Sequence, residues 1–244
     1  MYTQKRNAQS DSGFTLLELL IVISIIAILS VMLIIVINPA ETLRKSRDAQ
    51  RISDLNTIKT AMGIYTTSTS SPQLSKDASG VLNNSACKIG SGGGVYTAVL
   101  AQPVIRYSFP TTPNITDLGL DGAVFTYAAG LNQVTPTALS STDGTGWLPV
   151  NFDTLTSGSP ISNLPVDPTN TITSTAGVAF TDLVYRYACN STSLTYEVNA
   201  ALESNEYTTA NDKRAADGGN NAFLYEVGTN LKILGGTSGA ANEF

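Results

Sequence analysis

The chain has 244 residues, 42% of them hydrophobic, which is enough for a folded core. Its formal net charge is −5. The part of the chain after residue 60 contains seven basic and fourteen acidic residues, so it lacks the clustered Lys and Arg that phosphate binding needs. The chain contains no histidine, the commonest general base and metal ligand. These features disfavour nucleic-acid binding, and with no local catalytic motif we expect a protein that is not an enzyme.

A long apolar segment lies close to the N-terminus. Residues 14–37 carry no charge except Glu18. As a helix this segment would be about 36 Å long, more than the ~30 Å of bilayer hydrocarbon. A secretory signal would have a shorter apolar core and then small residues at a cleavage site, whereas this run leads into another helical stretch. We therefore predict a retained membrane-spanning helix over residues 14–37.

Glu18 is the residue that a plain signal anchor leaves unexplained. A carboxylate inside a membrane-spanning helix costs about 2.5–3.5 kcal/mol, so a partner is expected nearby. The segment contains no Lys or Arg. A positive group on the same helical face would be an amine at Phe14, four residues earlier, and this amine exists only if the chain is cut after Gly13.

The stretch "GFTLLE", Gly13 to Glu18, follows a short leader that contains Lys5 and Arg6. It resembles the class III signal of type IV prepilins and of type II secretion pseudopilins. In that family a membrane-embedded prepilin peptidase cuts after the glycine and methylates the new N-terminal residue. The resemblance implies that residues 1–13 are a leader peptide, that Gly13 and Phe14 are the processing residues, that Phe14 is N-methylated, and that Glu18 acts in assembly.

The charges beside the apolar segment conflict with this family over orientation. Two basic residues precede the segment and four follow it, so the positive-inside rule alone would place the C-terminal side in the cytoplasm. The resemblance, a possible disulfide and the Ser/Thr-rich body favour the opposite. We predict a single-pass membrane protein with a cytoplasmic leader and an extracytoplasmic C-terminal domain, which after processing lies in a filament on the cell surface or in the periplasm.

Residues 38–66 are predicted to continue as an amphipathic helix. Pro39 lacks an N–H and fixes φ, so a helix kink is expected there. Apolar residues then recur at steps of three and four, which predicts a stripe that packs on another surface: Ile52, Leu55, Ile58, Met62 and Tyr65. The charged residues opposite are interpreted as a solvated face, with contacts to neighbouring subunits as the alternative: Arg44, Arg47, Asp48, Arg51 and Asp54.

Residues 67–244 are predicted to form an extracellular globular β-rich domain. Short runs rich in β-branched and aromatic residues indicate strands at 123–130, 183–190, 194–202 and 223–231. The second and third runs flank "NSTS" and predict a hairpin in which Arg186 and Glu197 face each other. The segments "WLPVNF" and "NLPVDP" are interpreted as loop punctuation.

A sheet packed on the helical stripe would bury both apolar faces. The resemblance implies the same α+β, type IV pilin-like fold: a long N-terminal helix, membrane-spanning in its first half and amphipathic in its second, on a C-terminal antiparallel sheet.

Cys87 and Cys189 lack the spacing of a zinc site or a redox pair. If the body lies outside the cytoplasm, one disulfide is the simplest interpretation, and two buried free thiols are the alternative. Asp212 and Asp217 are weak calcium candidates without EF-hand spacing, and a plain exposed turn is the simpler interpretation. No other cofactor is expected.

These patterns predict a structural subunit of a type IV pilus-like filament, cut by prepilin peptidase after Gly13 and polymerised through its N-terminal helix. The implied partners are the peptidase, identical or related pilin subunits, the inner-membrane assembly machinery and, before assembly, membrane lipid; no specific nucleic-acid binding is indicated. The alternatives are a major-type pseudopilin of a type II secretion system and a membrane-anchored extracellular binding protein that does not polymerise.

Overall fold

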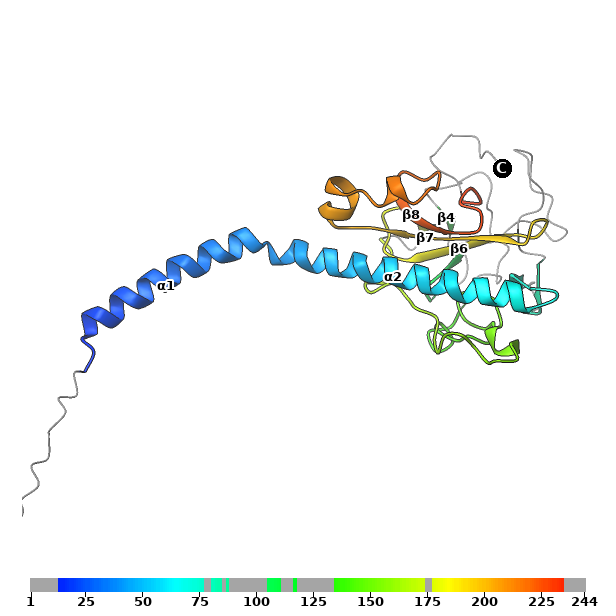
Figure 1. Ribbon diagram of the computed structural model, residues 1–244, viewed down its shortest axis with the longest axis horizontal. Coiled ribbons are helices and arrows are strands. Elements are labelled where there is room, and N and C mark those ends of the chain that lie inside the picture. Colours follow the sequence, from blue (N-terminus) through cyan, green and yellow to red (C-terminus); the bar gives the residue numbers. More distant parts are fainter. Residues whose placement is uncertain are drawn as a thin grey trace, which may run out of the picture. The chain divides into compact units, whose positions relative to one another are not determined.

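The computed structural model describes residues 13–76, 80–84, 87, 105–110, 116–117, 134–173 and 177–234. The chain divides into two compact units, Met1–Leu43 and Arg44–Phe244. The first unit holds helix α1 (Leu16–Ile37) and the start of helix α2 (Pro39–Ser68), and the second holds the rest of α2 and the strands. Figure 1 shows these elements in sequence colours.

The two helices are separated by a single residue. Asn38 adopts a left-handed backbone conformation with φ of 43°, which Asn tolerates better than most residues, and its N–H donates to the carbonyl of Ile34 at 3.3 Å. Pro39 is the first residue of α2, where its missing N–H removes no helical hydrogen bond and its fixed φ suits the helix. The interruption therefore lies at Asn38, and Pro39 starts the second helix.

A four-stranded antiparallel sheet forms the centre of the second unit, in the order β3-β6-β7-β8. Its strands are β3 (Arg106–Tyr107), β6 (Tyr185–Asn190), β7 (Thr195–Ala201) and β8 (Leu224–Gly228). The predicted hairpin is confirmed as β6 and β7. The candidate strand at 123–130 lies outside the described residues.

Two short strand pairs accompany this sheet. Strands β1 (Ser75–Lys76) and β2 (Leu82–Asn83) are antiparallel, whereas β4 (Thr116–Asp117) and β5 (Gly177–Val178) are parallel. The remaining described residues are largely turns and loops with short helical segments.

The hairpin register corrects one expected contact. Arg186 lies opposite Asn199, and Glu197 lies opposite Ala188, so Arg186 and Glu197 are diagonal neighbours and not a facing pair. Arg186 instead donates to backbone carbonyls, including that of Val184 at 3.3 Å. The turn comprises residues 191–194, one position later than the predicted "NSTS", and this shift moves the pairing.

The sheet packs against the apolar stripe of α2. Leu55, Ile58, Met62 and Tyr65 are buried as the helical spacing predicted, while Ile52 is half-buried at the margin. Residues of β6, β7 and β8 complete this core. The α+β arrangement is thus confirmed and is consistent with a pilin-like fold.

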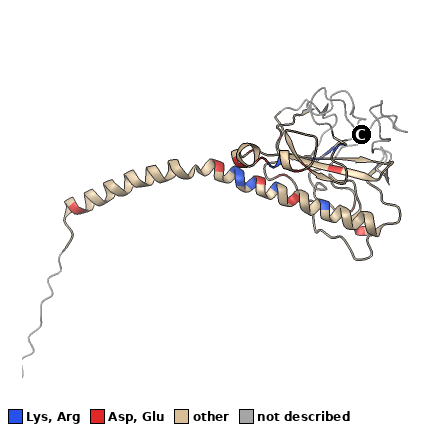
Figure 2. Cartoon of the chain, turned by 45° about the horizontal axis from the view of Figure 1, so that its top comes forward, with Lys and Arg blue, Asp and Glu red and all other residues tan. Residues whose placement is uncertain are grey.

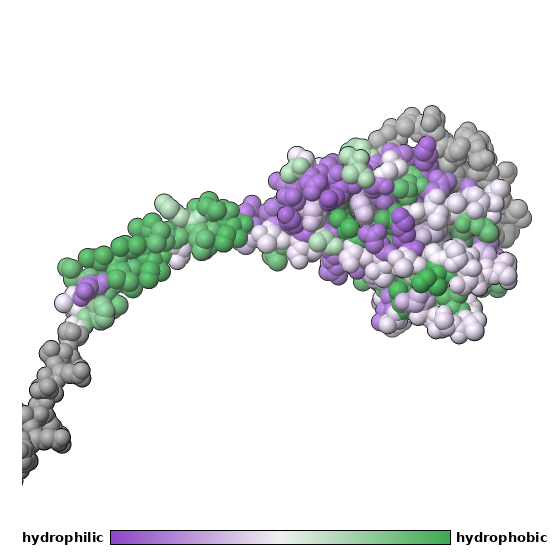
Figure 3. Space-filling view, viewed as in Figure 1, coloured by the Kyte–Doolittle hydropathy of each residue, from purple (hydrophilic) through white to green (hydrophobic). Residues whose placement is uncertain are grey.

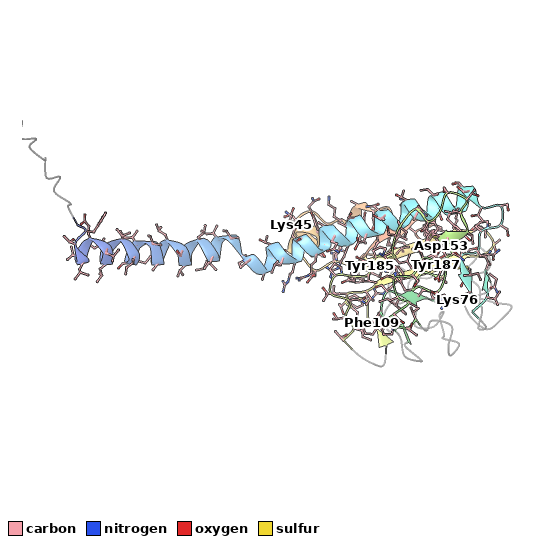
Figure 4. The ribbon with its side chains drawn as sticks, turned by 90° about the horizontal axis from the view of Figure 1, so that it is seen from below. Lys45, Lys76, Phe109, Asp153, Tyr185 and Tyr187 are labelled. Carbon is pink, nitrogen blue, oxygen red and sulfur yellow. A yellow bond between two sulfur atoms is a disulfide. The ribbon has the colours of Figure 1, made fainter. Side chains whose placement is uncertain are left out.

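Tyrosine hydroxyls of the sheet bind polar groups of α2 at this interface. Tyr185 donates to the Asp54 carboxylate at 2.8 Å, and Tyr196 donates to the Lys59 carbonyl at 3.2 Å. Figure 4 labels Tyr185 and its neighbour on the same face, Tyr187. Buried aromatic rings thereby contribute apolar area without leaving their hydroxyl groups unbonded.

Irregular segments supply another part of the core. The two "LPV" segments lie in loops, as predicted, and they also contribute buried side chains, which was not expected. Trp147, Val150 and Phe152 are fully buried, and Leu164 is nearly so. The indole of Trp147 donates to the carbonyl of Pro165 at 2.9 Å, which joins the two segments. In both segments large apolar side chains alternate with turn residues. Each turn therefore points the next apolar side chain into the core.

Candidate assembly site

The Gly13–Phe14 peptide bond lies outside the helix. Helix α1 begins at Leu16 with Thr15 as its N-cap, so both residues precede the first helical turn. Phe14 is 85% exposed, and the space beside Gly13 is open to at least 4 Å. A peptidase needs an accessible backbone outside regular structure, and this bond has both properties.

Glu18 forms a capping box with Thr15, a contact that the sequence analysis missed. The Glu18 N–H donates to the Thr15 hydroxyl at 3.2 Å, and the Thr15 N–H donates to the Glu18 carboxylate at 3.4 Å. A carboxylate in the first turn is also favoured by the helix dipole. The signal was available as Thr-x-x-Glu before an apolar run. In the described chain Glu18 thus has a partner three residues away, at the helix end where cleavage would create a new amine.

The rest of α1 is apolar on all sides, and none of its residues is buried. The hydroxyls of Ser24 and Ser30 donate to helix carbonyls four residues earlier, at 2.6 and 2.7 Å. In the described part of the chain, one helical stretch, starting at Leu16, is long and apolar enough to cross a membrane. Figure 3 shows α1 mostly green with a purple patch near its start, and Figure 2 shows charge on it only near its start.

A cluster of ionised side chains anchors α2 in the second unit. Arg51 is fully buried and makes two hydrogen bonds to the Asp167 carboxylate, at 2.7 and 3.0 Å. It also binds Asp48, which is fully buried on the same helix, at 2.7 Å, and Glu203 at 2.8 Å. This finding corrects the interpretation of a solvated charged face, because these charges are removed from water and compensated by partners far along the chain.

Glu203 connects this cluster to the end of β7. Arg47 makes a two-bond contact with the Glu203 carboxylate, at 2.7 and 2.8 Å, while the backbone N–H groups of Glu203 and Ser204 donate to Asp48. Hydrogen bonding to Arg47, followed by the contacts with Arg51, lowers the pKa of Glu203 to about 2. Glu203 therefore stays ionised at physiological pH, and the cluster fixes α2 against the sheet end.

Cys87 and Cys189 form a disulfide that spans 102 residues of sequence, and both are buried. Cys189 lies in β6, so the bond ties the segment after β2 to the central sheet. In the chain-entropy model a loop of this length contributes about 4–5 kcal/mol.

The two calcium candidates have protein partners. Asp212 accepts hydrogen bonds from the Arg214 guanidinium at 2.8 and 2.9 Å, and Asp217 accepts from the N–H groups of Gly219 and Glu226 at 2.8 and 2.9 Å. Among the described residues, no group of three His, Cys, Asp or Glu side chains is arranged to hold a metal ion. Calcium binding by Asp212 and Asp217 stays an untested prediction.

Two buried carboxyl groups lie on the sheet face that carries Arg186, away from the α2 stripe. Glu197 accepts the N–H groups of Ile233 and Leu234 at 2.9 and 2.8 Å, and Glu226 accepts that of Asn221 at 2.9 Å. Burial, together with the nearby Glu226, raises the pKa of Glu197 well above its usual value, and burial raises that of Glu226 to about 7.

An exposed Gly-Phe bond, an apolar helix with a capped glutamate and a second helix docked on an antiparallel sheet define a class: membrane-anchored α+β proteins built like pilin precursors. Residues 9–34 match the family model for the prokaryotic N-terminal methylation motif, the class III signal peptide of the type IV pilin and pseudopilin family. Neither the curated proteins nor the solved structures yield a match to the chain. The motif marks a pilin- or pseudopilin-type precursor and indicates a structural protein.

Proposed function

We propose that this chain is the structural subunit of a type IV pilus-like filament, cut after Gly13 and polymerised through α1. One observation carries the proposal: the exposed Gly13-Phe14 bond lies directly before a helix whose apolar surface is exposed on all sides, and Glu18 lies in the first turn of that helix. The motif implies processing by a prepilin peptidase and pilin assembly in general. A folded body on such a helix suits a building block better than a catalyst.

Assembly would use the charge that cleavage creates. The new Phe14 amine lies four residues from Glu18 and pairs with its carboxylate, within the subunit or on a neighbour, because opposite charges at this spacing share one helical face. Thr15 already holds the carboxylate at the helix start. The pairing fixes the axial register of an incoming subunit, and the apolar helices then leave lipid for a shared filament core.

The topology follows from this mechanism. The leader lies in the cytoplasm, α1 spans the membrane, and the body, residues 67–244 with the docked part of α2, lies outside. The partners are the prepilin peptidase, membrane lipid before assembly, the inner-membrane assembly machinery and further pilin subunits. N-methylated Phe14 is the expected mature N-terminus.

The test is the substitution Glu18→Ala in cells that carry the peptidase and the assembly machinery. We expect a mature N-terminus at Phe14 by mass spectrometry but at least a tenfold loss of filaments by electron microscopy, because the amine has lost its partner. Glu41→Ala, which removes an acidic residue outside α1, serves as the matched control and should leave filaments intact. Normal filaments from Glu18→Ala refute the proposed role of Glu18.

The same cells separate the pilus from the alternatives. A pilus subunit gives filaments on the cell surface, whereas a secretion pseudopilin is required for the export of folded proteins. A chain that is cleaved, reaches the membrane and never polymerises is an anchored binding protein.

A further inference from the structure

A partly exposed tyrosine ring lies between two lysines at the end of the body where α2 begins. The ring of Tyr207, in the short helical segment Glu206–Ala210, has the Lys45 ammonium 5.8 Å from its centre and the Lys213 ammonium 6.0 Å from it. These are cation–π distances. Figure 4 labels Lys45, and Figure 1 shows the segment 206–210 in orange near the start of α2. The ring therefore brings two cations together that would otherwise repel each other.

Both lysines keep the capacity to bind an anion. Lys45 lies 3.7 Å from Glu206, but the two side chains are 48% and 39% exposed, and such surface pairs contribute little. Within the described residues Lys213 makes no ion pair, and the adjacent carboxylate of Asp212 is bound twice by Arg214. Each ammonium group carries three N–H donors, so both can donate to the oxygens of a phosphate.

Two exposed phenylalanines lie at the same end of the sheet. Phe180 and Phe223 are 37% and 43% exposed, and their ring centres are 4.9 Å apart. Phe223 directly precedes β8, whose first residue pairs with Ala201 at the end of β7. Glu203, two residues later, binds Arg47 of α2. The aromatic pair and the start of α2 therefore share one end of the body.

Chain length keeps this end close to any membrane that α1 crosses. Lys45 follows Ile37, the last residue of α1, by eight positions, and a helical segment of that length is about 12 Å long. The polar region on each side of a bilayer is about 5–7 Å thick, and a lysine side chain extends toward it. Aromatic rings favour this boundary, and anionic head groups attract Lys close to the surface.

We propose that this end of the body lies on the lipid surface and binds anionic phospholipid head groups while α1 crosses the bilayer. The lysines donate to phosphate oxygens, and the phenyl rings enter the boundary between head groups and acyl chains. The rest of the body is acidic, with fourteen acidic and seven basic residues after residue 60, so an anionic surface repels it and fixes the orientation. The inference goes beyond the filament, because it requires a spanning α1 and no polymerisation.

Fluorescence quenching on the full chain in lipid nanodiscs tests the contact. A dye is attached at Thr209→Cys, close to Tyr207, or at Ser193→Cys in the turn at the opposite end of the sheet. Both positions are exposed, and the two native cysteines form a buried disulfide that leaves no other thiol. The quencher is a nitroxide on the lipid head group. In phosphatidylcholine with phosphatidylglycerol, quenching at position 209 should be about threefold that at 193, and about twofold lower in phosphatidylcholine alone.

Substitution of the lysines tests the head-group contact. Lys45→Gln combined with Lys213→Gln should lower the quenching at position 209 in phosphatidylglycerol to the level found in phosphatidylcholine alone. Lys59→Gln combined with Lys232→Gln removes two exposed lysines elsewhere in the body and should leave the quenching unchanged. An effect of phosphatidylglycerol that survives the loss of Lys45 and Lys213 overturns the inference.

Substitution of the phenylalanines tests the apolar contact. Phe180→Gln combined with Phe223→Gln should lower the quenching in both lipid compositions alike, because insertion of a ring needs no anionic head group. Leu194→Gln, at an exposed position of the opposite turn, should lower it in neither. Equal quenching at positions 209 and 193 in the parent chain overturns the inference. Failure of the full chain to insert into the nanodisc contradicts the spanning role of α1 and overturns the inference with it.

Discussion

Helices α1 and α2 follow one another directly and have opposite chemistry. The 22 residues of α1 are all exposed and carry one charge, whereas the 30 residues of α2 include buried apolar and buried ionised side chains. None of the residues of α1 is buried among the described residues of its own chain. Helix α2 packs against the sheet of its own chain, which buries its apolar stripe.

The charges of the two helices make the same contrast at the level of single residues. Glu18 is held by Thr15, three residues away, whereas Arg51 is held by Asp167, 116 residues away. A local partner keeps a charge satisfied wherever the helix moves. A distant partner satisfies a charge only in the folded state. The contacts of Arg51 therefore require the folded body, whereas the contact of Glu18 requires only the first turn of its own helix.

The largest expected effect is on α2. Arg51→Met leaves Asp48 and Asp167 buried without their cation, which should lower the free energy of unfolding by about 3–5 kcal/mol. Denaturant unfolding of the full chain in detergent micelles measures it. Lys59→Met, the matched loss of an exposed charge on the same helix, should stay within about 0.5 kcal/mol. Equal effects of the two substitutions would show that the ion cluster does not hold α2.

The same added carboxylate should act differently on the two helices. Ala27→Asp places a charge near the middle of α1 and costs about 2.5–3.5 kcal/mol on insertion, a decrease of roughly 100-fold in the equilibrium constant for membrane insertion. Ala49→Asp adds the same charge at an exposed position of α2 and should leave insertion unchanged. Carbonate extraction of membranes separates the inserted chain from the rest. Similar insertion of both variants would contradict the assignment of α1 as the spanning helix.

The free energy of unfolding of the second unit should depend on pH, because two of its carboxyl groups have pKa values shifted in opposite directions. The pKa of Glu226 is raised from 4.5 to about 7, so its stabilising contribution is full below pH 4.5 and is lost as the pH rises through 7, about 3 kcal/mol at most. The pKa of Glu203 is lowered to about 2, so its contribution is present above pH 4.5 and is lost as the pH falls through 2.

Unfolding followed from pH 2 to pH 9 should therefore show greatest stability in mildly acidic solution. Glu226→Gln should reduce the neutral-to-alkaline decline, to which buried Glu197 also contributes, and leave the acid decline in place, whereas Glu203→Gln should reduce the acid decline. If the stability of Glu226→Gln still fell to the same extent above pH 6, that fall would be caused by other groups.

The smallest effect concerns the start of α1. Thr15→Ala removes the N-cap and should cost about 1 kcal/mol, an increase of roughly fivefold in hydrogen exchange at the Glu18 amide. Thr15→Ser keeps the hydroxyl and should exchange like the parent chain. An unchanged rate in Thr15→Ala would mean that the capping box does not form in solution.

The features that the sequence predicted are local. The apolar run, the Gly13-Phe14-Glu18 spacing, the stripe from Leu55 to Tyr65 and the β6–β7 hairpin each depend on residues within a few turns or one tight turn. The capping box was equally local and was missed because Glu18 was considered only as a buried charge.

The ion cluster could not be predicted in the same way. Nothing near Arg51 indicates that Asp167 and Glu203 will meet it, and amphipathic helices usually place such charges in water. The role of the "LPV" segments was hidden for a similar reason, since short irregular stretches carry no periodicity that marks them as core. Both depend on contacts between residues far apart in sequence.

The ion cluster also sets an order of events during synthesis. Arg51 leaves the ribosome 152 residues before Glu203, an interval of about 8–30 s at ordinary elongation rates. Until then α2 lacks Glu203, which binds both Arg47 and Arg51, and its docking waits for the last third of the chain. The helix that emerges early is therefore among the last elements to be fixed, and a stalled or truncated chain would leave α2 unanchored.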